Sequence, residues 1–166
     1  GKIDILVNNN NAFDDSKYDT QTDEQWDYII ENNLNALFRV CQESLIFIKD
    51  SGRIINFSSI SGEFGGEFSP AYVAASKGIM AFTHNLARFL SDRSITVNCI
   101  SPGYVQNNEA DQTIFNAKSK SVTRPLLEES LGKIDNISQL ALFLASDECS
   151  FITAQTISIN GGAWVR

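Results

Sequence analysis

Histidine and cysteine are scarce in this sequence, which has one histidine and three cysteines among 166 residues. His84 has neither a second histidine nor a paired cysteine to join it, so we expect no metal site. Cys41, Cys99 and Cys149 are odd in number, widely spaced and set in apolar surroundings. We therefore expect buried free thiols in a reducing compartment, the cytoplasm, and no disulfide framework.

Long apolar runs are also missing. No run approaches the roughly 18 residues that suggest a membrane span, and the chain does not begin with a charged-then-apolar leader, so we expect neither span nor signal peptide. The net charge of −7 argues against nucleic acid or an anionic membrane as a partner. With 43% hydrophobic residues the composition is that of a globular protein, and we expect residues 1–166 to form one partial domain.

A third absence concerns nucleotide binding. The sequence contains no Gly-x-Gly-x-x-Gly, the turn that binds a pyrophosphate where a strand leads into a helix. Gly65 and Gly66 do not qualify, because they follow no suitable strand-to-helix turn. The chain therefore has no recognisable pyrophosphate-binding motif of its own.

Apolar runs and helical patterns alternate along the chain. Residues 3–7 are a short continuous apolar run typical of a buried parallel strand, and residues 54–57 are a second apolar run. Residues 95–100 form a β-branched strand, and residues 156–159 close the sheet. Helical patterns cover residues 22–48 (opened by a capping box at residues 22–25), 70–90 and 136–145. This alternation predicts an α/β fold around a parallel sheet.

The stretch of residues 54–77 carries the most chemistry. Read as strand, glycine-rich loop and helix, it places Ser59 at the carboxyl end of a strand and Tyr72 and Lys77 in the first helical turns, at the sheet edge where ligands bind. A phenol has a pKa of about 10, and a neighbouring ammonium lowers that pKa. Tyrosine then becomes a usable proton donor or acceptor, and a serine hydroxyl can hold the substrate oxygen. The combination suits carbonyl/alcohol redox chemistry with hydride supplied by another molecule.

The same residues resemble a known family. Ser59, thirteen residues before Tyr72 and followed by Lys77, looks like the Ser-Tyr-Lys site of the short-chain dehydrogenases/reductases. Asn33, before a leucine, matches the helix asparagine of the family's catalytic tetrad. Three further segments match in the right order: Asp-Ile-Leu-Val-Asn-Asn at residues 4–9, Asn-Cys-Ile-Ser-Pro-Gly at residues 98–103, and the last strand with its Gly-Gly exit at residues 153–162.

The resemblance implies a Rossmann-like, doubly wound parallel sheet that lacks the N-terminal βαβαβ half carrying the pyrophosphate turn. It implies hydride transfer between NAD or NADP and a carbonyl compound or secondary alcohol. In this family the two long helices pack against their copies in a second subunit, so a homodimer or homotetramer is also implied.

The resemblance assigns roles to four residues. Tyr72 would be the acid/base, Ser59 would hold the substrate oxygen, and Lys77 would tune the tyrosine and bind the nicotinamide ribose. Tyr72 and Lys77 would both contact the cofactor. Asn33 would support a water that relays protons toward the lysine. The alternative for Asn33 is a core asparagine whose amide is satisfied by local backbone.

Further cofactor contacts are implied at two loops. Asn8 and Asn9 match the family's Asn-Asn-Ala-Gly turn, whereas the asparagines at the next two positions depart from it. Asn8 would line the adenosine-ribose side of the groove; alternatively, these residues form only a polar turn. Pro102, Gly103 and Val105 would shape the nicotinamide pocket.

One departure bears on the chemistry. The family has Tyr-x-x-x-Lys, but here Lys77 follows Tyr72 by five residues. On a regular helix a separation of four leaves two side chains about 40° apart around the axis, and five leaves them about 140° apart. A π-bulge within residues 73–75 would restore the family geometry. Alternatively, the loop before the helix absorbs the extra residue, and Val73 takes the tyrosine's place.

Two functions follow from these alternatives. The first is an NAD(P)-dependent oxidoreductase acting through Ser59, Tyr72, Lys77 and Asn33. The second is a truncated, catalytically silent relative that acts through subunit association. Dinucleotide binding and turnover distinguish the two hypotheses, whereas association is expected from both.

Overall fold

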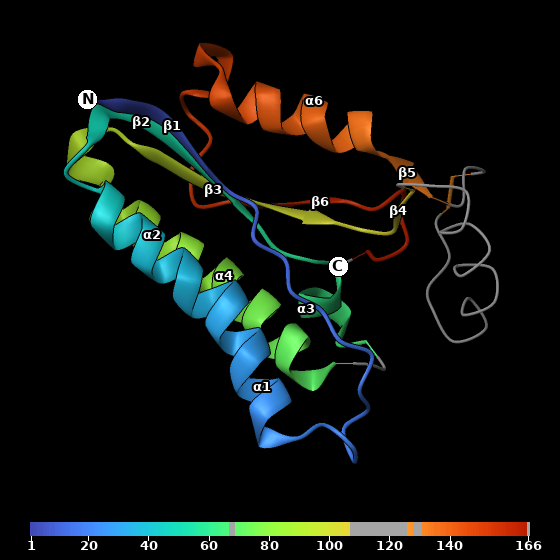
Figure 1. The fold of residues 1–166 in the computed structure, drawn as a ribbon. Coiled ribbons are helices and arrows are strands. Elements are labelled where there is room, and N and C mark those ends of the chain that lie inside the picture. Colours follow the sequence, from blue (N-terminus) through green and yellow to red (C-terminus); the bar gives the residue numbers. More distant parts are fainter. Residues whose placement is uncertain (67–68, 107–125, 128–130, 166) are drawn as a thin grey trace.

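A parallel β-sheet forms the centre of the molecule (Figure 1). The computed structural model describes residues 1–66, 69–106, 126–127 and 131–165. Four strands pair in the order β1-β2-β3-β6, and all three pairings are parallel. Their bounds are β1 Ile3–Asn8, β2 Ile48–Phe57, β3 Thr96–Pro102 and β6 Thr156–Ile159. The predicted parallel α/β fold is confirmed.

Helices cover both faces of this sheet (Figure 1). On one face lie α1 (Asp23–Ile30), the π-helical turn η1 (Glu31–Asn35), α2 (Ala36–Ser44) and α4 (Pro70–Phe89). The other face is covered by α6 (Ile134–Ala145). The smaller elements are α3 (Ser61–Phe64), η2 (Ser91–Arg93), η3 (Asp147–Cys149) and the paired strands β4 (Val105–Gln106) and β5 (Gly132–Lys133).

Two apolar clusters fill the space between sheet and helices. Successive strand residues point to opposite faces, so Ile54 contributes to the cluster under α2 and α4, whereas Ile55 contributes to the cluster under α6. Cys41 and Cys99 belong to the first cluster and Cys149 to the second. All three thiols are buried and free, as the sequence predicts.

The first long helix differs from its predicted length. It begins at the predicted capping box, where Thr22 accepts from the Gln25 amide and the Gln25 side chain accepts from Thr22. It ends at Ser44, so the expectation that helix continues to Ile48 is wrong. Ile48 instead opens β2 and pairs with Ile3, because its side chain fills the first apolar cluster from the sheet.

The carboxyl ends of β1 and β2 are joined by buried polar side chains. The Asn8 amide donates to Asn56 Oδ1 (2.8 Å), and the Asn56 amide donates to Thr83 Oγ1 (3.0 Å). The Thr83 hydroxyl in turn donates to the Ile79 carbonyl oxygen (2.8 Å). This chain of hydrogen bonds links two strands to α4 directly beneath the edge of the sheet.

The segment after β3 is described only at its ends, where β4 pairs with β5. Residues 107–125 and 128–130 lie outside the described residues. Among the helices of the described chain, none has the length and apolar character needed to cross a membrane.

Candidate active site

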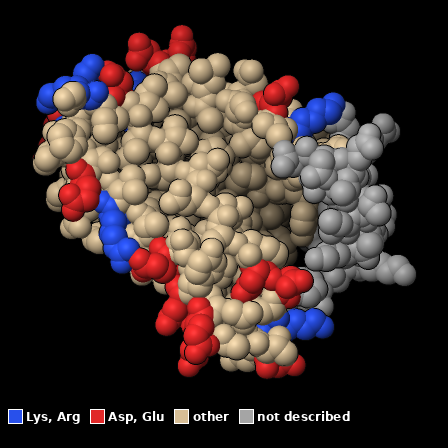
Figure 2. Space-filling view, viewed as in Figure 1, with Lys and Arg blue, Asp and Glu red and all other residues tan. Residues whose placement is uncertain are grey.

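A cavity of about 690 Å³ opens at the carboxyl edge of the sheet. Its polar wall consists of the loop after β1, the end of β2 and the first turns of α4; its apolar wall comes from α6 and the end of β3. None of the described residues that line it is charged. On the face seen in Figure 2, Lys, Arg, Asp and Glu lie mainly around the margin and the centre is uncharged.

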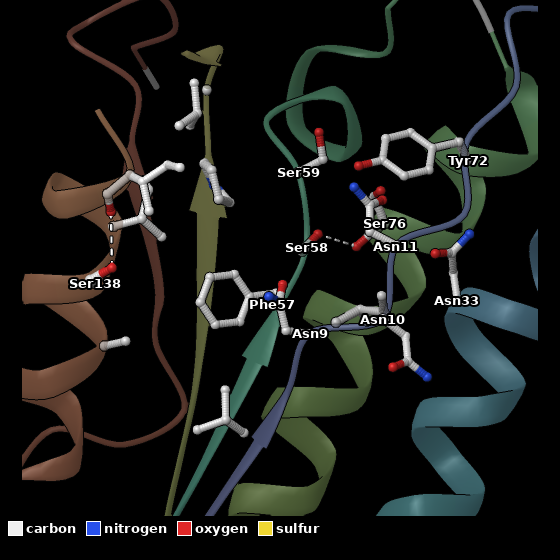
Figure 3. Close-up of a pocket in the computed structure, with 18 of the residues that line it drawn as sticks. Asn9, Asn10, Asn11, Asn33, Phe57, Ser58, Ser59, Tyr72, Ser76 and Ser138 are labelled. Atoms are coloured by element: carbon white, nitrogen blue, oxygen red, sulfur yellow. Dashed lines mark hydrogen bonds between the residues drawn. The ribbon is translucent and has the colours of Figure 1, made fainter. Parts of the chain in front are cut away.

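Ser59 and Tyr72 meet on the polar wall. Ser59 follows β2, and its hydroxyl oxygen accepts from the Ser61 amide (3.2 Å) at the start of α3. Tyr72 lies in the first turn of α4, and Phe13 packs edge-to-face against its ring at 5.2 Å between centroids. Figure 3 shows the Tyr72 hydroxyl pointing toward Ser59, with Ser76 and Asn11 beside it.

The Tyr72 hydroxyl is a neutral phenol in this setting. Burial raises its pKa above the ordinary value of 10.0, and this effect is the largest one on the group. Hydrogen bonds with Ser59, Ser76 and Asn11 lower the pKa, but by less than burial raises it. At neutral pH the residue is therefore a proton donor and a poor base.

The structure does not bring Lys77 to this wall. Helix α4 is α-helical from end to end, without a π-bulge after Tyr72, so the two side chains diverge by about 140°. Lys77 is exposed and does not line the cavity. Val73 does not take the place of Tyr72 either. The residue one turn beyond Tyr72 on the cavity wall is Ser76.

Asn33 lies in the π-helical turn and lines the cavity. Its side-chain amide donates to the carbonyl oxygens of Ala12 (2.8 Å) and Ile29 (2.9 Å), and its Oδ1 accepts from the Ala12 amide (2.9 Å). Both amide hydrogens are used in these contacts. Asn33 therefore holds the loop after β1 against the helix, whatever further role it has.

The residues expected to bind cofactor divide into two groups. Asn9, Pro102, Gly103 and Val105 line the cavity. Asn8 does not; it is buried beneath the wall, where its amide donates to Asn56 Oδ1. This contact holds Asn8 within the sheet, and its place on the adenosine-ribose side of the groove stays a prediction.

A family model described as enoyl-(acyl carrier protein) reductase matches residues 1–163. Curated relatives include nodulation protein G of Rhizobium meliloti (strain 1021), which is 34% identical over 163 residues. The chain belongs to the short-chain dehydrogenases/reductases.

Two further relatives carry names that state an activity. The 3-oxoacyl-[acyl-carrier-protein] reductase FabG of Escherichia coli (strain K12) is 34% identical over 167 residues, and the acetoacetyl-CoA reductase of Shinella zoogloeoides is 37% identical over 164 residues. The alignments cover 96% to 99% of this chain but only 66% to 68% of the three relatives. The chain thus spans about two thirds of the length of these short-chain dehydrogenases/reductases.

The residues that the family resemblance expects around the nicotinamide, Pro102, Gly103 and Val105, lie together on the lining of the cavity. The wall formed by Pro102, Gly103 and Val105 is close-packed: a Cβ on Gly103 would lie 2.8 Å from the Asn160 Cβ, so this backbone is held against the next loop. Asn9 provides amide donors and acceptors across from it. For the pyrophosphate, the sequence offers no glycine-rich turn.

Sequence reasoning missed several of the residues that line the cavity, among them three polar ones on the wall that carries Tyr72. Asn10, Asn11 and Ser76 all line it, and Asn11 and Ser76 reach the Tyr72 hydroxyl. The run of four asparagines from Asn8 is a signal that could have drawn attention to the first two. Ser76 stands at the four-residue spacing from Tyr72, so the family pattern itself points to the position although the residue type differs.

Proposed function

We propose that this chain is the catalytic part of an NAD- or NADP-dependent oxidoreductase that interconverts a carbonyl compound and a secondary alcohol. The observation that carries the proposal is the pair of hydroxyls of Ser59 and Tyr72 on one wall of an uncharged cavity. Membership of the short-chain dehydrogenases/reductases supports the reaction type. Lys77 has no part in the proposed site, because it lies outside the cavity.

The chemistry divides between cofactor and chain. A bound nicotinamide supplies or accepts the hydride. The Ser59 hydroxyl donates a hydrogen bond to the substrate oxygen, and the Tyr72 hydroxyl gives its proton to that oxygen as negative charge develops on it. Pro102, Gly103 and Val105 bound the space for the nicotinamide ring, and an uncharged wall strengthens the hydrogen bonds to the substrate oxygen.

The substrate class follows from the relatives. The names of two relatives specify 3-oxoacyl-[acyl-carrier-protein] and acetoacetyl-CoA as substrates, and both are thioesters with a ketone two carbons from the thioester carbonyl. We therefore propose a ketone of this class as the first substrate to test. Across the cavity from the hydroxyl pair, the apolar side chains of Ile137, Ala141 and Leu142 form a wall suited to an acyl chain.

The test is turnover of acetoacetyl-CoA with NADH or NADPH, followed by nicotinamide absorbance. Tyr72→Phe keeps the ring and its contact with Phe13 but removes the proton donor, so the rate should fall by about 10²- to 10⁴-fold. Tyr18→Phe is the matched control, because Tyr18 is 88% exposed and lies outside the cavity. Equal rates in the Tyr72→Phe variant and the wild type would contradict the proposal.

A second candidate is a catalytically silent protein that acts through association. It is favoured by the exposed Lys77 and by aromatic side chains left exposed along α1, α2 and α4, including Trp26, Phe38 and Phe89. Such side chains also support a homodimer or homotetramer under the first candidate. Titration with NADH and NADPH separates the two, since the silent protein should neither bind dinucleotide nor turn over ketones.

A further inference from the structure

The inserted residue in α4 changes which side chain lies next to Tyr72 on the cavity wall. Ser76 follows Tyr72 by about one helical turn and lines the cavity, and its relative exposure is 2%. Its backbone carbonyl accepts from the Ser58 hydroxyl (2.8 Å), which fixes this turn of the helix against the end of β2 (Figure 3). Lys77, one position further, faces solvent.

The partners of the Tyr72 hydroxyl are all uncharged. They come from three different elements: Ser59 from the end of β2, Asn11 from the loop after β1, and Ser76 from α4 itself. No charged residue of the described chain lines the same wall. An ammonium is the usual means of stabilising a phenolate, and none lies on this wall among the described residues. Burial therefore keeps the phenol protonated, although the three hydrogen bonds favour the phenolate.

We propose that Ser76 occupies the position beside Tyr72 where a lysine would otherwise stand, so that no ammonium reaches the phenol and Tyr72 acts as a neutral proton donor in ketone reduction. The ketone reduction in this proposal rests on the proposed function. The protonation state of Tyr72 does not rest on it and can be measured separately.

The proton and electron balance sets the direction. The carbonyl carbon gains a hydride from a reduced nicotinamide dinucleotide, which is oxidised, and the carbonyl π bond breaks. The oxygen takes the proton of the Tyr72 hydroxyl, and the phenolate recovers a proton from water. The reverse reaction needs the phenolate as base. Reduction should therefore be independent of pH up to the pKa of Tyr72, whereas alcohol oxidation should increase with pH until that pKa is reached.

The decisive variant exchanges two neighbouring residues. Ser76→Lys/Lys77→Ser keeps composition, charge and helix length, and it places an ammonium one turn after Tyr72. The pKa of Tyr72 is measured as the difference in phenolate absorbance between each protein and its Tyr72→Phe derivative, with circular dichroism to confirm folding. We expect the exchange to lower that pKa by about one to three units and to extend alcohol oxidation toward neutral pH.

Two single variants complete the test. Ser76→Ala should raise the pKa of Tyr72 further, because one hydrogen bond that opposes the burial effect is lost. Lys77→Ser should leave that pKa unchanged. A rise in the Tyr72 pKa on Lys77→Ser would overturn the proposal, since it would place the ammonium within reach of the phenol. This measurement needs no turnover, so it stays decisive if the wild type reduces no ketone, a result that would count only against the proposed function.

Discussion

At Tyr72, position and proton affinity have separate causes. The ring is fixed by Phe13 on one side and by the start of α4, while the proton affinity comes from burial among uncharged groups. The sequence predicts that Tyr72 lies in the first helical turn near Ser59, because the thirteen-residue separation matches the family pattern. It does not predict the contact with Phe13. It also shows the five-residue spacing to Lys77, but not the continuous helix that turns this spacing into a separation. Ser76 becomes significant only with that helix in view.

Gly103 offers a prediction about packing. A Cβ there would lie 2.8 Å from Asn160 Cβ and 2.9 Å from Asn160 Cα, and the backbone atom cannot yield without moving the loop after β6. Gly103→Ala should lower the free energy of unfolding by about 1–3 kcal/mol, measured by urea denaturation. Gly132→Ala is the control, because its nearest contact would be 3.5 Å. Equal stability of the two variants would show that the loop adapts.

Among the elements, the strands were the easiest to predict and the first helix the hardest. All four predicted strands are present, and the strand at residues 156–159 has the predicted bounds although its residues are only partly buried. Ile48 follows helical spacing from Cys41 by chance, so periodicity could not distinguish the end of α2 from the start of β2. The sequence does not predict the π-helical turn, because the apolar residues on either side of Asn33 keep ordinary helical spacing.

The π-helical turn around Asn33 supports a second stability prediction. Asn33→Ala removes three hydrogen bonds and leaves the backbone of Ala12 and the Ile29 carbonyl without their side-chain partner. Unfolding free energy should fall by about 1–3 kcal/mol, and hydrogen exchange at Ala12 should quicken. Asn32→Ala is the matched control in the same turn, since its amide makes one exposed contact with Tyr28. A loss no larger than in the control would remove Asn33 from this supporting role.

At the scale of the whole molecule, the sequence predicts the sheet and part of the polar wall of the cavity, but none of the α6 residues that form the apolar wall. Ser59, Tyr72 and Gly103 reach the expected edge, because the carboxyl ends of parallel strands lie together. Asn8 and Lys77 do not line the cavity, although the adjacent residues Asn9 and Ser76 do. Which of two adjacent residues faces the cavity depends on how the strand or helix packs, and a sequence pattern does not specify that packing.

Association can be tested on the helical face. Phe38 on α2 packs against Phe82 on α4 and remains 45% exposed. If this face joins two copies, Phe38→Glu should weaken association at least about tenfold, because a charge is then buried in the contact. Sedimentation velocity over a concentration series measures the shift. Phe151→Glu, at a fully exposed phenylalanine on another part of the molecule, should leave the distribution unchanged.

Helix α4 is fastened to the sheet at two places eleven residues apart, Tyr72 to Ser59 near its start and Thr83 to Asn56 further along. Eleven residues are close to three whole turns, so both anchors face the sheet together. Removing one residue between them would rotate one of these side chains away from the sheet by about 100°. A deletion that placed a lysine beside Tyr72 would therefore break either the Tyr72–Ser59 or the Thr83–Asn56 contact. A lysine can therefore be placed beside Tyr72 by substitutions at positions 76 and 77 with both contacts kept, whereas deleting one residue of the helix would break one of them.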